Sequence, residues 1–277
     1  MNRRAKEHLW DALVSCFAIL LGLIIVFPVI YCILGAFKTP AEFASPVLLP
    51  KSFAYLENFR NALHQAPLLR YMLNSFITAF TGSLIRLAMA VSAAFVLTHY
   101  DFRGKKLCFF FLLGTMMMPA DTLLMANYAT VSRLGLLNSY LGIIIVSFVS
   151  ASQMFLLRQK FLSFPKSLRH AAMVDGCGDL RYLLTILLPL CRGTLTTLFV
   201  QSFLSLWNAY LWPLMVTASA PDMRTIMVGI TKLNSWEDTN YELVLAGVTI
   251  SLIPSFVLFA LMRRNLNKDN TEGSLNG

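Results

Sequence analysis

Charged side chains are scarce in this sequence. Asp, Glu, Lys and Arg make up 13% of the 277 residues, about half the share that is usual in soluble domains. Hydrophobic residues make up 57%, so a soluble monomer of this size would expose more apolar surface than water tolerates. The composition therefore excludes an ordinary soluble globular domain and indicates a membrane protein.

The sequence also lacks the residue patterns of enzymes, metal centres and disulfide-rich domains. Its five cysteines and four histidines are dispersed and form neither a C-x-x-C pair nor an H-E-x-x-H motif. It contains no nucleophile with a neighbouring base and no glycine-rich loop that would hold a phosphate. We therefore expect a chain that is not an enzyme and that binds no metal or cofactor of its own.

Long runs without charge dominate the sequence. The six runs cover residues 12–37, 71–100, 107–132, 134–157, 193–221 and 243–262, and only Arg86 and Asp121 interrupt them. Each exceeds the roughly 18 to 20 residues that cross a bilayer as a helix. Because the runs are continuous and do not alternate, they favour helices over a barrel. The sequence predicts an all-α fold with six transmembrane helices in a single domain over residues 1–277.

The basic residues lie mostly on one side of these spans. With the N-terminus in the cytoplasm, the inside segments 1–11, 99–107, 158–192 and 263–277 carry 15 of the 23 Lys and Arg residues. This is the positive-inside pattern, so both termini are expected in the cytoplasm. The net charge of +9 then reports membrane topology and does not indicate nucleic-acid binding.

The first outer connection, residues 38–70, contains four prolines and is expected to form an ordered cap. Within it, residues 55–63 place Leu56, Phe59 and Leu63 at helical spacing. This helix would either cover the helical bundle or contact an external partner.

The cytoplasmic segment 158–192 is far longer than a helical hairpin requires. Pro165 can occupy the first turn of a short helix, where its missing N–H costs nothing. Asp175-Gly176 should end that helix, because glycine adopts a positive φ at a helix C-terminus without strain. A second helix would begin near Asp179 as its N-cap. The small apolar residues of the first helix fall largely on one side: Leu168, Ala171, Ala172 and Val174.

This short helix has two interpretations. Its two alanines would let another backbone approach closely, which suits docking into a groove of a partner protein. Alternatively, the helix would lie on the lipid surface.

Residues 170–190, "HAAMVDGCGDLRYLLTILLPL", resemble the E-A-A…D-G-A…I-x-L-P motif of the permeases of binding-protein-dependent ABC importers. The flanking strings "RLGLLNSYLGIII", "FLLRQKF" and "SFLSLWNAYLWPL" are similar to the permeases for sugars and sn-glycerol 3-phosphate, and specifically to the maltose-type second permease subunit. The resemblance extends over nearly the full length.

The resemblance implies a MetI-like permease subunit in the cytoplasmic membrane of a bacterium or archaeon. It implies a second permease subunit, two ATPase subunits that bind ATP and Mg²⁺, and an extracytoplasmic binding protein that delivers a sugar or glycerol-phosphate solute. The motif region would be the coupling helix that inserts into the ATPase. The predicted ATPase-coupling residues are Leu168, His170, Ala171, Ala172, Asp175 and Gly176, of which Ala171, Ala172, Asp175 and Gly176 match the motif residue by residue.

Two positions depart from the family pattern. His170 stands where the motif usually has Glu, so it would make the corresponding contact only partly and with a charge that depends on pH. The proline that usually follows L-P-L is absent, and the chain reads Cys191-Arg192-Gly193.

Arg86 and Asp121 are costly at membrane depth and therefore mark a candidate functional site. Both lie about 21 Å from the cytoplasmic edge at 1.5 Å per residue. They could pair with each other, face a water-filled pathway or pair with a partner permease. An ion- or proton-coupled secondary carrier that uses both residues is the alternative function.

The fifth run places amides and aromatic rings on an otherwise apolar helix. Stacking and amide hydrogen bonds suit a sugar, whereas an interfacial aromatic belt is the alternative. With Arg86 and Asp121, the candidate substrate-pathway residues are Gln201, Trp207, Asn208 and Tyr210.

Overall fold

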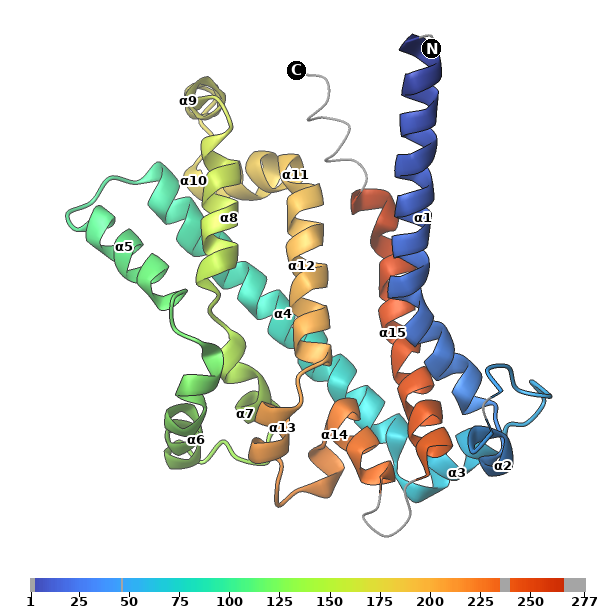
Figure 1. Cartoon of the computed structure of the whole chain (residues 1–277). Helices are drawn as coiled ribbons and strands as arrows, with labels where there is room; N and C mark the ends of the chain where they lie inside the picture. The colour runs from blue at the N-terminus through green and yellow to red at the C-terminus, as the bar shows by residue number, and fades with distance from the viewer. Residues whose placement is uncertain (1–2, 46, 235–239, 267–277) are drawn as a thin grey trace. The chain divides into compact units, whose positions relative to one another are not determined.

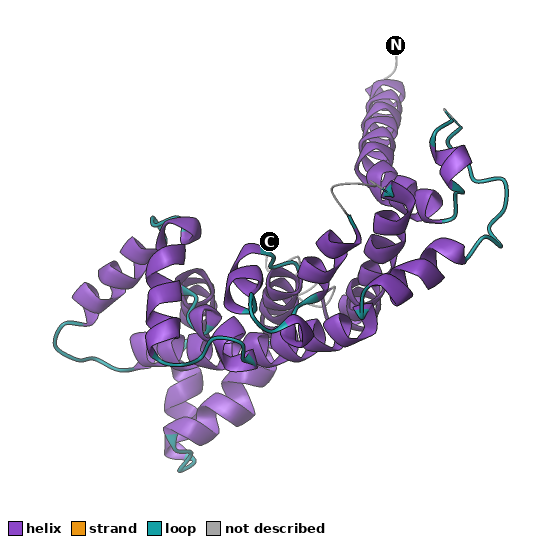
Figure 2. Cartoon of the chain, turned by 90° about the horizontal axis from the view of Figure 1, so that it is seen from below, coloured by secondary structure: helices purple, strands orange, loops and turns teal. Residues whose placement is uncertain are grey.

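The computed structural model describes residues 3–45, 47–234 and 240–266, without the side chains of residues 3–9, 120, 121 and 263–266. All regular structure in these ranges is helical, which confirms the predicted all-α class (Figures 1 and 2). The chain divides into two compact units. One comprises Met1–Leu68 with Ile230–Leu252, and the other comprises Leu69–Gly229 with Ile253–Gly277.

The first unit contains α1 (Arg3–Ala36) and the N-terminal part of α15 (Tyr241–Leu266). Residues Trp10–Ala36 of α1 have a mean hydropathy of 2.9 and are long enough to cross a membrane, as are residues Tyr241–Met262 of α15. These helices match the first and sixth predicted spans. Gly35 lets them approach, since a Cβ at this position would collide with the side chain of Leu245.

The predicted cap also belongs to this unit and contains α2 (Pro40–Phe43) and α3 (Glu57–Gln65). Asn58 of α3 is buried and donates to the backbone carbonyls of Ala36 at 2.9 Å and Lys38 at 2.7 Å. A buried amide that binds two carbonyls holds α3 against the end of α1. The expected helix is therefore present, although it begins two residues later than predicted.

The second unit begins with α4 (Leu68–His99), a single helix that matches the second predicted span. It continues through α5 (Lys105–Thr115), η1 (Ala120–Leu123), α6 (Leu124–Arg133), α7 (Tyr140–Ile144), η2 (Ile145–Ser147) and α8 (Ala151–Leu162).

Two of the predicted spans are interrupted here. The third, residues 107–132, leaves the helix between Thr115 and Ala120, because Pro119 has no N–H and disfavours a helical residue before it. The fourth, residues 134–157, is two helical pieces that meet at an angle of 52°.

The remaining elements are α9 (Lys166–Val174), α10 (Asp179–Tyr182), the π-helical turn η3 (Leu183–Leu187), α11 (Leu188–Leu190), α12 (Arg192–Trp207), α13 (Leu211–Val216), η4 (Pro221–Met223), α14 (Ile226–Ile230) and η5 (Thr231–Leu233). The fifth predicted span, residues 193–221, is not one helix, because α12 ends at Trp207. The α10–α11 segment and α12 meet at 83°. Three predicted spans are thus continuous helices, and three are broken.

The core of the second unit joins α4, α8 and the segment from α9 to α12. Ala94, Leu157, Leu187 and Cys191 are fully buried in it. Gln153 of α8 donates from Nε2 to the Leu198 carbonyl at 3.1 Å and to Ser202 Oγ at 2.6 Å. Figure 1 shows α9 at one end of this unit and α6, α7 and α13 at the opposite end.

Candidate functional site

The short helix α9 ends in a backbone motif that its sequence dictates. Gly176 has a φ of 73°, as expected for a glycine at a helix C-terminus. Its N–H donates to the Met173 carbonyl at 3.1 Å, and the N–H of Cys177 donates to the Ala172 carbonyl at 2.9 Å. This is a Schellman motif, which satisfies the last carbonyls of the helix and reverses the chain.

The predicted docking face of α9 divides between the core and the surface. Ala172 is 5% exposed and packs with the half-buried Leu168 against the core of the second unit. His170, Ala171 and Asp175 are exposed, and Val174 is 87% exposed. The i, i+4 pair Leu168 and Ala172 therefore anchors α9, and the predicted contact of both residues with the ATPase stays a prediction.

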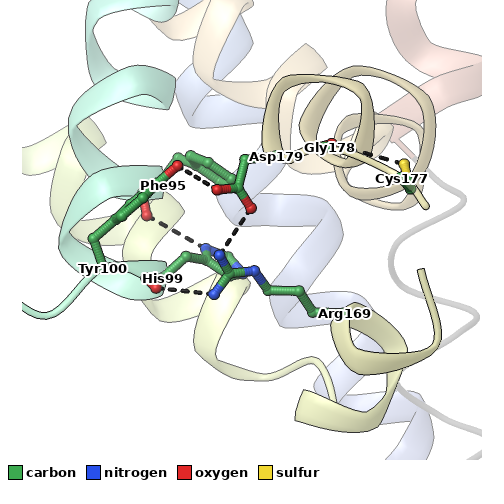
Figure 3. A network of polar contacts seen from close by, with 7 residues as sticks. All are labelled: Phe95, His99, Tyr100, Arg169, Cys177, Gly178 and Asp179. Carbon is green, nitrogen blue, oxygen red and sulfur yellow. Dashed lines mark hydrogen bonds and ion pairs between the residues drawn. The ribbon is translucent and has the colours of Figure 1, made fainter. Parts of the chain in front are cut away.

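Arg169 connects α9 to two other elements (Figure 3). Its Nη1 donates to the His99 carbonyl at the end of α4 at 2.9 Å, and its Nη2 lies 2.8 Å from Asp179 Oδ1 at the start of α10. The hydroxyl of Tyr100 donates to the other carboxylate oxygen of Asp179 at 2.5 Å. Charge-assisted hydrogen bonds of this kind are about twice as strong as neutral ones.

Asp179 does not have the role predicted for it. Gly178 is the N-cap of α10, and the Asp179 carboxylate makes no cap hydrogen bond. The carboxylate instead accepts from Arg169 and Tyr100, and the bond from Tyr100 raises the pKa of that phenol above its usual value. The carboxylate thus accepts hydrogen bonds from Arg169 and Tyr100 and none from the backbone N–H groups at the start of α10.

Sequence reasoning missed Arg169 and Tyr100 as parts of this site. A signal was present, because Arg169 and Asp179 lie on either side of the Asp175-Gly176 turn. A chain reversal at Gly176 brings residues on its two sides back toward each other, so opposite charges at those positions indicate a pair.

Arg86 belongs to the continuous helix α4, and its side chain caps the break between η2 and α8. Its Nε donates to the carbonyl of Ser147 at 2.6 Å, at the last residue of η2 and before α8 begins. Carbonyls at a helix end lack helical partners and carry partial negative charge, so a cation binds there favourably. The side chain of Asp121 lies outside the described residues, and the Arg86–Asp121 pair stays a prediction.

The other candidate pathway residues are placed differently from one another. Trp207 is 1% exposed and stacks on Phe203 with ring centroids 5.7 Å apart. It therefore belongs to the core of the second unit, and its role in the solute path stays a prediction. Gln201, Asn208 and Tyr210 are exposed.

A second polar cluster lies at the N-terminal end of α4. Asn74 is fully buried and donates to the carbonyls of Asp222 at 2.7 Å and Arg224 at 2.9 Å. Its Oδ1 accepts from the hydroxyl of Tyr140 at 2.8 Å. One buried amide thus holds three segments together, and no local sequence pattern points to it.

Long apolar helices, some of them broken within the span, and a short helix clamped beside the core define a polytopic helical membrane protein. Residues 86–269 match the family described as binding-protein-dependent transport system inner membrane component, and the chain belongs to this family. It is a permease subunit of an ABC importer, as the sequence motif implied.

Two curated relatives extend the match over almost the whole chain. The sn-glycerol-3-phosphate transport system permease protein UgpE of Brucella melitensis is 31% identical over 264 residues, which cover 91% of this chain and 93% of the relative. The protein of the same name from Escherichia coli O157:H7 is 31% identical over 265 residues, 92% of this chain and 94% of the relative.

The fold is also shared with a solved structure. A chain of a bacterial ABC transporter involved in the import of the acidic polysaccharide alginate superimposes with a TM-score of 0.82. The alignment covers 95% of this chain and 98% of that chain at 21% identity. This likeness shows that the two chains share a fold.

Proposed function

We propose that this chain conducts sn-glycerol 3-phosphate, or a sugar-type solute of similar size, across the inner membrane of a bacterium. The observation that carries this proposal is the 31% identity, over nearly full length, with permeases named for sn-glycerol 3-phosphate transport. The solute is delivered by an extracytoplasmic binding protein. The chain works beside a second permease subunit and two ATPase subunits, which bind the ATP and Mg²⁺. The family does not support the secondary carrier that was the alternative function.

The proposed topology has six membrane crossings in one transmembrane domain over residues 1–277, with both termini in the cytoplasm. The charge asymmetry supports this orientation. In the described residues, three helices and two bent pairs account for up to five of these crossings by length and composition. Irregular backbone is tolerated at membrane depth where protein or a water-filled cavity surrounds it.

The exposed surface of α9 is the proposed contact with the ATPase. It consists of His170, Ala171, Val174, Asp175 and Gly176. Leu168 and Ala172 pack against the core and so hold the helix in place. Arg169 supports a mechanical role, since it binds α4 and α10 at the same time. A displacement of α9 by the closing ATPase would then move the ends of both elements with it.

The proposed solute path includes Arg86, with Asp121, Gln201, Asn208 and Tyr210. Arg86 is half-buried within α4 and supplies a positive charge at membrane depth. A phosphate-bearing solute needs such a charge to replace part of the hydration that it loses in the membrane.

Reconstitution of the chain with its partner subunits in proteoliposomes tests this function. We expect ATP-dependent uptake of sn-glycerol 3-phosphate that requires the binding protein and is insensitive to ionophores. Uptake that follows an ion gradient and ignores ATP would contradict the proposal.

A variant pair tests the role of α9 in the same preparation. Ala171→Trp enlarges an exposed position of α9 and should abolish binding of the ATPase. Leu180→Trp, at an exposed position of α10, is the control and should retain it. Equal recovery of the ATPase with both variants would exclude α9 as the contact.

A further inference from the structure

A small pocket opens where the end of α4 meets the start of α5 and the middle of α8. Its volume is about 240 Å³. It lies at the C-terminal end of α4, next to the end of the candidate membrane span Leu68–His99. Its lining residues are Leu97, Asp101, Lys105, Lys106, Phe109 and Arg158.

The lining carries an excess of positive charge. Lys105 is neutralised by Asp101, with 3.0 Å between its Nζ and the carboxylate. Over the residues that the structure describes, no carboxylate lies within ion-pair distance of Lys106 or Arg158. Two uncompensated cations therefore face one pocket, and an anion is the ligand that this charge favours.

The guanidinium of Arg158 is fixed in orientation and keeps a donor available for an anion. Its guanidinium lies over the ring of Phe109, with Cζ 4.3 Å from the ring centroid. Stacking fixes the plane of the group without using its N–H donors. Its Nε is buried, and in the described part of the chain it has no hydrogen-bond partner. A buried donor of this kind needs a partner, and a phosphate oxygen is a suitable one.

An exposed apolar surface lies on α5, the helix that also carries three residues of the pocket lining. Leu107, Phe110 and Phe111 of α5 are all at least two-thirds exposed. They belong to the same helix as Lys105, Lys106 and Phe109 but lie on a different side of it from the pocket. A ligand that used both surfaces would have a phosphate at one end and hydrocarbon at the other.

We propose that this pocket binds the phosphodiester headgroup of an anionic phospholipid, with Lys106 and Arg158 on the phosphate and the acyl chains along α5. Basic pockets between transmembrane helices near the cytoplasmic surface are suited to such headgroups. Inorganic phosphate shares the headgroup chemistry but cannot use the apolar surface. The proposal goes beyond solute transport, because it concerns the membrane and not the solute.

The test is lipid binding to the complete detergent-solubilised transporter complex, followed by native mass spectrometry. Wild type should bind phosphatidylglycerol in preference to phosphatidylcholine. Lys106→Gln with Arg158→Gln should weaken phosphatidylglycerol binding about 25-fold, because each cation near an anionic headgroup contributes about fivefold. Millimolar inorganic phosphate should not displace the lipid.

Two further variants make the result specific. Arg181→Gln with Arg192→Gln removes two exposed cations from the neighbouring segment outside the pocket and should leave binding unchanged. Lys106→Gln alone leaves the Arg158–Phe109 stack in place and should weaken binding about fivefold. The proposal is overturned if both double variants weaken binding equally, if the two lipids bind equally to wild type, or if phosphate displaces the lipid.

Discussion

Arg169 and Asp179 form an ion pair across the chain reversal at Gly176, with 2.8 Å between Nη2 and Oδ1. The pair joins α9 to the first turn of α10. Because Arg169 also binds the His99 carbonyl, one side chain connects three elements. This arrangement makes α9 part of a rigid unit rather than a helix on a loose loop.

The first prediction concerns this pair. Arg169→Gln and Asp179→Asn should each increase amide hydrogen exchange in residues 166–176, since α9 then loses a connection to α4 or α10. The side chains are 23% and 38% exposed, so screening limits their coupling energy to about 1 kcal/mol or less. The double variant should therefore cost less than the sum of the single variants. Strict additivity in this double-mutant cycle would show that the two groups do not interact.

The second prediction concerns Gly176. Gly176→Val forces a β-branched residue to a φ of 73°, which should cost about 1–2 kcal/mol and reduce the solute transported per ATP hydrolysed. Gly176→Asn should be milder, because Asn tolerates this region better. Gly178→Ala is the control, since Gly178 has a φ of −69° and open space around it. Equal transport by the Val and Ala variants would refute the role of the Gly176 turn.

The third prediction concerns Arg86. Arg86→Met leaves the Ser147 carbonyl without its donor and should lower stability by about 1–3 kcal/mol. Arg86→Gln retains a donor but lacks the charge, so it should fold better than the Met variant and still transport a phosphate-bearing solute poorly. Arg86→Lys should transport best of the three. Thermal unfolding in detergent and uptake in proteoliposomes measure the two effects separately.

A capping role and a role in the solute path predict different relations between the uptake and the stability of the Arg86 variants. A role in capping alone predicts that uptake follows stability in all three variants. A role in the solute path requires that the Gln variant lose uptake beyond its loss of stability.

The fourth prediction concerns Gly142 in α7. A Cβ at this position would collide with the backbone carbonyl of Leu136, which cannot rotate away as a side chain can. Gly142→Ala should therefore cost about 1–3 kcal/mol in detergent. Gly114→Ala in α5, where a Cβ meets nothing within 4 Å, should be neutral or stabilising by up to about 1 kcal/mol. Equal melting temperatures for the two variants would contradict the close packing of α7 against the Leu136 backbone.

Features that depend on neighbouring residues in the chain were predicted well. The uncharged runs of α1, α4 and α15 are long enough to define a helix by length alone. The turn at Gly176 was predicted because only its own backbone conformation is involved. The break after Trp207 was misjudged, because a run without charge does not report where the helical hydrogen bonds stop.

The sequence by itself determined the membrane class, the helical fold, the family and the Asp175-Gly176 reversal, since composition, run length and local backbone preference decide these. Only the tertiary structure decided that Ala172 and Trp207 face the core, that Asp179 binds Arg169, and that Arg86 binds Ser147. The partners of Arg86 and Asn74 are 61 to 150 residues away in the chain. Which of many compatible polar groups becomes a partner depends on how distant segments pack, and no local pattern encodes that choice.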